Sequence, residues 1–230
     1  VEIISSCFLE NSSSIKSFSS KDTIKVVDCF LMHCEDLEYI YLPKCEIIGN
    51  DFALRAENLK TINLPNVKRV GNDFLTCNKL IENINMPNLE TAGSLFLRNN
   101  LVLKEINLPK LKKVGFSFLE ANNIIEKTYL PNLIKAGSSF LRENTCLREL
   151  YVPMLKNIDN NFLENNQDLE YLSFPEVETI GNNVLSKNTK LKSLYIPRIQ
   201  FIGINFLKNN QELLESSCIY RQSMHNLLRS

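Results

Sequence analysis

The sequence predicts a β-rich solenoid of about ten stacked coils, because residues that form turns and residues that form a core recur with one period. All eight prolines lie 22 residues apart, from Pro43 to Pro197. Each of the seven glycines stands six residues after a proline, and the remaining slot holds Asp159. Residues with restricted or permissive backbones are the ones that a turn selects. We therefore expect one quasi-linear domain in which each coil contacts mainly its neighbours.

The predicted core follows from the apolar columns of this repeat. Counting each proline as position 0, apolar residues recur at −6, −3, −1, +2, +5, +9 and +10, and residues 103–124 show the whole unit. Position +9 holds phenylalanine in every coil from Phe8 to Phe206, except at Val184. Seven inward positions per coil make one continuous core. We expect the phenylalanine rings to stack along the solenoid axis as a spine.

Each coil is predicted to contain one short strand. Residues −5 to −1 alternate in polarity, as in 38–42, which indicates a strand that pairs in parallel with its counterpart in the next coil. The stretch after position +8 has adjacent Phe and Leu residues, which strict alternation does not explain. We expect it to form a loop or a single helical turn on the opposite side.

An asparagine column is predicted to be structural. Position +13 holds asparagine in seven consecutive coils, from Asn78 to Asn210. An amide side chain both donates and accepts, so a ladder of them can satisfy loop backbone groups of its own and the next coil.

Two columns of charge are interpreted as ladders that hold the coils in register. Position −5 alternates in sign along the chain, through Lys16, Glu38, Lys60, Glu82, Lys104, Glu126, Arg148, Glu170 and Lys192. A shorter alternation at +11 runs through Arg98, Glu120, Arg142 and Glu164. In-register parallel strands place such residues about 5 Å apart, where an opposite-charge pair contributes about 0.2 to 1 kcal/mol. We interpret neither column as a binding patch.

The candidate partner-binding residues lie at −4 and −2, which share the face of the strand opposite the core. Six of the seven tyrosines stand there, and position −2 carries no charge. Tyrosine and asparagine supply rigid amphipathic area and adaptable hydrogen bonds, which suits protein recognition. Alternatively, tyrosine is there because it favours exposed strands and stacks on its neighbours. The candidate set, called here the tyrosine-asparagine face, is Tyr39, Tyr41, Asn63, Asn85, Asn107, Tyr129, Tyr151, Tyr171 and Tyr195.

A second candidate contact site is an apolar ridge at position +15. This column is polar at both ends of the chain but apolar in the middle, through Leu80, Val102, Ile124 and Cys146, and it is flanked by Leu101. Such a ridge is either a contact site, including one for homo-association, or a local widening of the core. We define the apolar ridge as Leu80, Leu101, Val102 and Ile124.

Composition and motifs argue against several classes of function. Lys+Arg and Asp+Glu both number 26, so no general field attracts nucleic acid or an anionic membrane. No apolar run approaches the length of a membrane span. The two histidines, His33 and His225, lie far apart in the sequence, and no metal-binding spacing, nucleophile elbow or phosphate-binding loop occurs. We expect no enzyme activity, no cofactor, no metal, no nucleic-acid binding and no membrane insertion.

The seven cysteines contain no CxxC motif, which favours a reducing compartment or incidental use in the core. Cys7 and Cys29 are 22 residues apart, so stacked coils place them within bridging range, and both the free and the bridged states remain open.

The solenoid is predicted to span residues 1–218, with an incomplete first unit, and residues 219–230 to form a C-terminal cap or tail. The chain begins in mid-repeat, so it is either a fragment of something longer or begins with an atypical cap. The tail has apolar residues at helical spacing, including Met224 and Leu227, so we expect a short helix that covers the last coil.

The pattern LxxIxLP, followed by IGxxFLxxN, resembles the leucine-rich repeat of the BspA-like (Treponema pallidum-type) class over about residues 4–218. It has FL where that class has AF, and asparagine where cysteine is usual; only Cys34 retains the cysteine. The resemblance implies a right-handed coil with one short parallel strand per repeat, whose strand face is the concave docking surface.

The resemblance also implies a non-catalytic protein-protein recognition module of a microbial secreted, surface or host-interacting protein, with a role in virulence. The alternative is a substrate-recognition or scaffold arm of a larger enzyme whose catalytic domain lies outside this chain. The resemblance thus favours a secreted or cell-surface location, whereas the cysteine usage favours a reducing cytosol.

Overall fold

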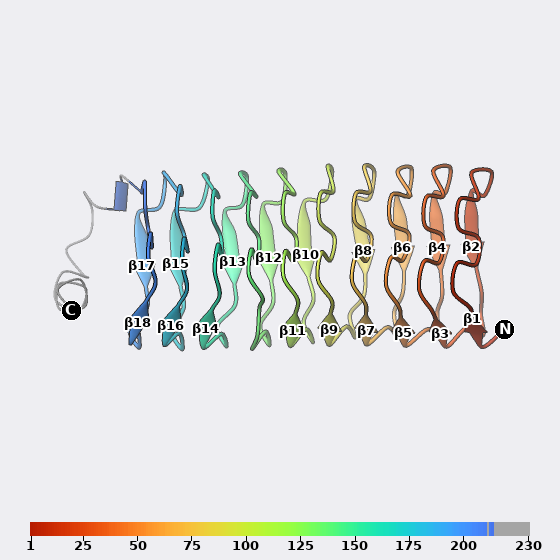
Figure 1. The fold of residues 1–230 in the computed structure, drawn as a ribbon, viewed down its shortest axis with the longest axis horizontal. Coiled ribbons are helices and arrows are strands. Elements are labelled where there is room, and N and C mark those ends of the chain that lie inside the picture. The colour runs from red at the N-terminus through yellow and green to blue at the C-terminus, as the bar shows by residue number, and fades with distance from the viewer. Residues whose placement is uncertain (211, 214–230) are drawn as a thin grey trace.

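The computed structural model describes residues 1–210, 212 and 213, and the coils in this part stack into one long rod (Figure 1). Residues 1–210 contain no helix, so the solenoid is built from short strands and turns. No helix of the described residues is long and apolar enough to cross a membrane. The predicted C-terminal cap, residues 219–230, lies outside the described residues.

The strand predicted for positions −5 to −1 is present over −4 to −2 and runs parallel to its neighbours 22 residues away. Ser17 pairs with Tyr39, for example, and Tyr129 pairs with Tyr151. The side chain at the middle position points inward and those at −4 and −2 point outward, as the alternation predicted. The three-residue strands are β2 (Ser17–Ser19), β4 (Tyr39–Tyr41), β6 (Thr61–Asn63), β8 (Asn83–Asn85), β10 (Glu105–Asn107), β12 (Lys127–Tyr129), β13 (Glu149–Tyr151), β15 (Tyr171–Ser173) and β17 (Ser193–Tyr195).

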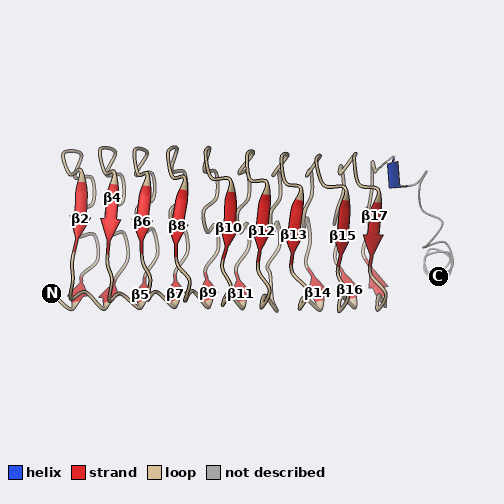
Figure 2. Cartoon of the chain, turned by 180° about the vertical axis from the view of Figure 1, so that it is seen from behind, coloured by secondary structure: helices blue, strands red, loops and turns tan. Residues whose placement is uncertain are grey.

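A second, two-residue strand follows the proline in most described coils, which the sequence analysis did not predict. It also pairs in parallel with the next coil, and it lies beside the longer strands as a separate strip (Figure 2). These strands are β1 (Ile3–Ile4), β3 (Lys25–Val26), β5 (Ile47–Ile48), β7 (Arg69–Val70), β9 (Thr91–Ala92), β11 (Lys113–Val114), β14 (Asn157–Ile158), β16 (Thr179–Ile180) and β18 (Phe201–Ile202).

The predicted phenylalanine spine is confirmed in the body of the rod. The phenylalanine side chains of the +9 column are fully buried from Phe30 to Phe162, and the rings of Phe96 and Phe118 lie 5.1 Å apart with 6° between their planes. Where Val184 interrupts the column, Phe162 instead meets Phe174 edge to face at 6.0 Å. Stacked and edge-to-face ring pairs each contribute stability beyond that of the apolar area that they bury.

The stretch that begins at position +8 is a loop, and its residues at +8, +10 and +12 have positive φ in every described coil. In one coil these are Leu95, Leu97 and Asn99, with φ values of 61°, 52° and 57°. The loops pair between coils as well: the amide N–H of Leu119 donates to the carbonyl of Phe96 at 2.9 Å. None of the positive-φ residues is valine, isoleucine or threonine, which this conformation disfavours.

The glycines serve close stacking and not a left-handed turn, which corrects the reason given from the sequence. Among the described residues no glycine has positive φ. A Cβ atom built on Gly137 would lie 2.7 Å from the carbonyl carbon of Gly115 in the preceding coil. Position +6 is therefore where neighbouring backbones approach closely in the coils that hold glycine. Val27, at the same position of an earlier coil, still donates its N–H to Ile4 at 3.0 Å.

Asp159, which stands at the position where seven other coils hold glycine, coincides with an opening between two coils. The two-residue strands form one sheet from β1 to β11 and another from β14 to β18. Among the described residues, no backbone hydrogen bond joins 134–137 to 156–159, whereas Gly181 donates to Ile158 at 2.8 Å in the next step. Asp159 places a Cβ at the position where the glycine-containing coils bring two backbones together. We call this opening the Asp159 seam.

The longer strands are also interrupted, at two steps of the described rod. They form the sheets β2-β4-β6-β8, β10-β12-β13 and β15-β17, so β8 is not paired with β10, nor β13 with β15. The second interruption lies further along the same two stretches of chain as the Asp159 seam, because β13 follows 134–137 and β15 follows 156–159. The first, called here the β8–β10 gap, leaves the two-residue strands β9 and β11 paired.

The asparagine ladder is confirmed over most of its length. The side-chain oxygen of Asn122 accepts the backbone N–H of Asn100 at 2.8 Å, and its amide donates to the carbonyl of Leu97 at 2.9 Å. The ladder breaks at three members, because the Oδ1 atoms of Asn78, Asn166 and Asn210 have no partner among the described residues; the Asn166 break lies between the coils that part near Asp159.

Candidate functional site

The tyrosine-asparagine face is built by the outward positions of the longer strands. Tyr129, Tyr151, Tyr171 and Tyr195 each expose about half of their surface or more, and Tyr39 exposes 38%. Tyr41 and Asn63 are half-buried, whereas Asn85 and Asn107 are exposed. The two strand interruptions divide the nine residues among three sheets. The structure therefore brings the predicted residues onto one side of the rod but not into one unbroken sheet.

The middle sheet carries the most ordered part of this face. The rings of Tyr129 and Tyr151 are stacked with centroids 5.1 Å apart and planes within 6° of parallel. Asn107 pairs in register with Tyr129 on the neighbouring strand, β10. The strand pairing thus holds two exposed aromatic rings and an exposed amide in one row.

The other sheets arrange their polar groups differently. On β4, Tyr39 and Tyr41 stack along one strand with centroids 6.5 Å apart. The amide of Asn85 donates to the side-chain oxygen of Asn63 at 2.9 Å, so these two amides partly satisfy each other. Tyr171 and Tyr195 stand on β15 and β17 at outward positions −4 and −2, so they do not face each other directly.

The predicted charge ladder at −5 forms direct ion pairs at some steps. Lys60 contacts Glu38 at 2.9 Å, and this hydrogen bond lowers the pKa of Glu38. Lys192 contacts Glu170, also at 2.9 Å, and the pKa of Lys192 is raised by that hydrogen bond. Between these steps, Glu82, Lys104 and Glu126 make no ion pair within the part of the chain that the structure describes.

The predicted ladder at +11 is confirmed as a continuous network. Glu120 forms an ion pair with Arg98 at 3.3 Å and accepts a hydrogen bond from Arg142 at 3.1 Å, and Arg142 also donates to Glu164 at 3.1 Å. Burial raises the pKa of Glu164, but the hydrogen bond and charge of Lys187, together with Arg142, outweigh burial and leave the pKa lowered. These charges are satisfied within the fold.

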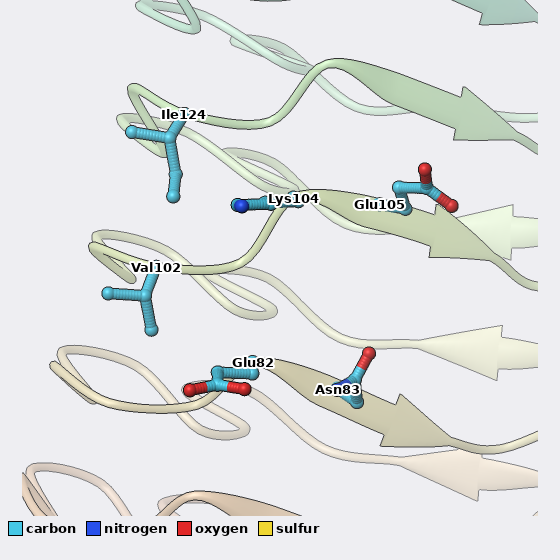
Figure 3. A pocket seen from close by; sticks show the side chains of 6 residues that line it. All are labelled: Glu82, Asn83, Val102, Lys104, Glu105 and Ile124. Atoms are coloured by element: carbon cyan, nitrogen blue, oxygen red, sulfur yellow. The ribbon is translucent and has the colours of Figure 1, made fainter.

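A hollow of about 450 Å³ opens at the β8–β10 gap, and Figure 3 shows its lining. It is lined by Glu82, Asn83, Val102, Lys104, Glu105 and Ile124. Glu82 and Lys104 extend toward the same side as Val102 and Ile124, while Glu105 points away from them (Figure 3). The hollow thus joins two members of the apolar ridge to two charges, Glu82 and Lys104, that form no ion pair within the described residues.

Sequence reasoning treated the ridge and the charge column as unrelated. A signal was present, because position +15 of one unit is position −7 of the next and so lies two residues before position −5. The residue between them is buried, as Leu103 is between Val102 and Lys104. Residues two apart around a buried one point outward together. The opening itself had no sequence signal that we recognise.

A second hollow, of about 410 Å³, lies at the interruption between β13 and β15. Its charges are largely paired: Asp168 accepts from Lys190 at 2.7 Å and lies 3.5 Å from Arg148. The hydrogen bond from Lys190 lowers the pKa of Asp168. This hollow therefore offers less unsatisfied charge than the first.

The apolar ridge lies on the surface. Leu80 and Leu101 are 38% and 49% exposed, and Val102 and Ile124 are half-buried. The neighbouring residues Ile81, Leu103 and Ile125 are fully buried. The ridge side chains therefore cover the core from outside and leave apolar area in contact with solvent.

Titratable groups that could support chemistry are sparse in the described residues. No group of three His, Cys, Asp or Glu side chains there is placed to hold a metal ion. Cys7 and Cys29 are both free thiols in this structure. Desolvation, followed by the hydrogen bond with Cys7, raises the pKa of Cys29 to about 11. His225 lies outside the described residues.

Comparison with known proteins gives one family. A family model described as BspA type leucine-rich repeat region (6 copies) matches residues 1–126 and 100–214. No curated protein matches the sequence significantly.

Solved structures give a similar fold. A leucine-rich repeat protein from Bacteroides ovatus has a TM-score of 0.54 and 17% identity, over 93% of this chain and 75% of that one. The pneumococcal vaccine antigen PcpA has a TM-score of 0.49 and 18% identity, over 94% and 75%. An internalin from Listeria monocytogenes has a TM-score of 0.35 and 14% identity, over 91% and 74%. At such identity, the likeness to the Bacteroides protein shows a shared fold alone.

Proposed function

The chain belongs to the BspA-type leucine-rich repeat family, and from this premise we propose that it is a non-catalytic module that binds a protein partner through its tyrosine-asparagine face. Leucine-rich repeats typically mediate protein-protein interaction. The single observation that supports this face is the exposed stack of Tyr129 on Tyr151, 5.1 Å apart.

The physical argument is that the stack is already arranged for binding. A tyrosine ring has few rotatable bonds, and each of these two rings is held by its neighbour. The two side chains would therefore lose little conformational entropy when a partner binds. The rings are about half exposed, and their hydroxyl groups provide polar ends beside the uncharged amide of Asn107. Such aromatic anchors are the residues on which binding energy concentrates.

A secreted or cell-surface location in a microbe is part of the same proposal, and it rests on the family resemblance. Expression of the native gene followed by fractionation and immunoblotting would test it. Detection only in the cytosolic fraction would contradict that location and leave the protein-binding proposal standing.

The binding face is tested by substitution once a partner has been captured and purified. Tyr129→Ala together with Tyr151→Ala is expected to weaken binding at least tenfold by calorimetry, with an unchanged melting temperature as evidence of folding. Phe116→Ala with Phe201→Ala is the control, because these aromatic side chains are also exposed, at 54% and 62%, but do not belong to the tyrosine-asparagine face. Unchanged affinity in the first variant, with folding preserved, means that the face is wrongly assigned.

A further inference from the structure

The apolar ridge and its flanking charges share a pattern that the protein-binding face does not use. Leu80, Val102, Ile124 and Cys146 occupy the same outward position in four successive coils. Beside them, at −5, run Glu82, Lys104, Glu126 and Arg148. The first three of these charges form no ion pair within the described residues, although Lys60 and Glu38 in the same column do. The surface therefore exposes apolar area together with unsatisfied charge of both signs.

This surface is complementary to itself. A two-fold axis that runs along the strands and passes midway between the coils of Val102 and Ile124 reverses the order of the coils in a second copy. Val102 then meets Ile124 of the second copy, and Leu80 meets Cys146. The same operation places Lys104 opposite Glu126 and Glu82 opposite Arg148. The apolar column meets apolar residues, and every charge meets its opposite.

The charges also select this arrangement over its neighbours. An axis that passed through the coil of Lys104 would place Lys104 opposite itself and Glu82 opposite Glu126, so like charges would meet. Like charges across an interface cost free energy, and complementary ones determine register. The four apolar residues of the +15 column, from Leu80 to Cys146, are centred between two coils, which is where an alternating charge column becomes its own complement.

We propose that the apolar ridge, extended by Cys146, is a self-association interface in which a second copy of this chain packs with its coils in reverse order about an axis between the coils of Val102 and Ile124. Such an isologous contact closes as a dimer and does not extend into a filament. The hollow lined by Val102, Lys104 and Ile124 lies within it. The interface uses none of the tyrosine-asparagine residues, so it goes beyond the proposed function and stands or falls independently of it.

The expected association is weak, because the ridge is short. Three coil spacings of about 4.8 Å separate Leu80 from Cys146, so the apolar strip is about 14 Å long. Small contacts of this kind give transient complexes. We expect sedimentation velocity of the 230-residue chain to show a monomer-dimer equilibrium that shifts with protein concentration.

The first test compares substitutions on and off the ridge. Val102→Glu with Ile124→Glu is expected to abolish the concentration dependence of sedimentation. Ile134→Glu is the control, because Ile134 is also exposed, at 48%, but lies at position +3, away from the ridge. Wild-type protein that remains monomeric at all concentrations overturns the proposal, as does a dimer that survives the double substitution.

The second test probes the register and does not depend on stability. In a Leu80→Cys variant, mild oxidation is expected to link position 80 of one copy to native Cys146 of the other. Within one chain these positions lie about 14 Å apart by coil spacing, beyond the Cα separation of about 7 Å that a disulfide spans. Adding Cys146→Ser is expected to remove the linked dimer. Peptide mapping that finds no 80–146 link overturns the antiparallel arrangement.

Discussion

Asp159 stands one coil beyond Gly137 at the same position of the repeat, and no backbone hydrogen bond joins 156–159 to 134–137 in the described structure. The loops just after these residues stay paired, because Ser139 donates to Asn160 and Leu163 donates to Phe140, each at 2.9 Å. A Cβ on Gly137 would lie 2.7 Å from the carbonyl carbon of Gly115, and Asp159 places a Cβ at this position of close approach. Further along the same two stretches of chain, the longer strands β13 and β15 are unpaired as well.

Asp159→Gly is predicted to close this seam and to stabilise the rod. Each restored backbone hydrogen bond contributes about 1 kcal/mol, and the loss of backbone entropy at glycine offsets about 0.5 to 1 kcal/mol. We expect a higher melting temperature, measured by calorimetry, and slower amide exchange at Asn157 and Ile158. Gly137→Asp is the converse variant and should lower the melting temperature. If both variants melt like the wild type, the steric explanation of the seam is incorrect.

The positive φ of the loop leucines predicts a difference in stability between two otherwise similar substitutions. Leu97 and Leu103 are both fully buried, but only Leu97 has positive φ, at 52°. Leu→Val removes a similar volume at each site, whereas a β-branched side chain at positive φ adds backbone strain of about 1 to 3 kcal/mol. Leu97→Val is expected to reduce the free energy of unfolding in urea by that much more than Leu103→Val. Equal losses would contradict the role of φ.

Glu164 predicts a specific dependence of stability on pH. Its pKa in the folded state is lowered, so its contribution to stability is present above the unfolded pKa of about 4.3 and is lost as the pH falls through the folded value. Glu164→Gln is expected to lower the melting temperature at pH 7 and to change it little at pH 2. A deficit that persists unchanged at pH 2 would point to packing and not to charge.

The −5 column predicts that equal charge reversals have unequal costs. Glu38 pairs with Lys60 at 2.9 Å, whereas Glu126 has no ion pair in the described structure. Glu38→Lys should therefore lower the melting temperature more than Glu126→Lys at low salt, and high salt should reduce the difference by screening. Both are measured at low protein concentration, where association does not contribute. A difference that is insensitive to salt would remove the electrostatic interpretation.

The stacking of the coils, the longer strands and the phenylalanine spine were predictable because each repeat of 22 residues completes one coil. Residues 22 apart, such as Phe96 and Phe118, meet as neighbours once the chain coils with that period, so the columns of the sequence become rows of contacts. The outward direction of Tyr129 and Tyr151 followed from strand alternation for the same reason. Asp159 was visible as an exception, although its consequence was not.

The left-handed loops and the gaps were decided by the tertiary structure. The positive φ of Leu97 is strained, and the pairing of the stacked loops on either side compensates for that strain. The signal available in the sequence was the absence of β-branched residues at +8, +10 and +12. The β8–β10 gap and its hollow depend on the summed packing of whole coils, which no column records. By itself, therefore, the sequence determined the period, the core and the direction of each side chain, because these are local or repeated properties. Which coils part, and which charges are left without a partner, depends on how all the coils fit together.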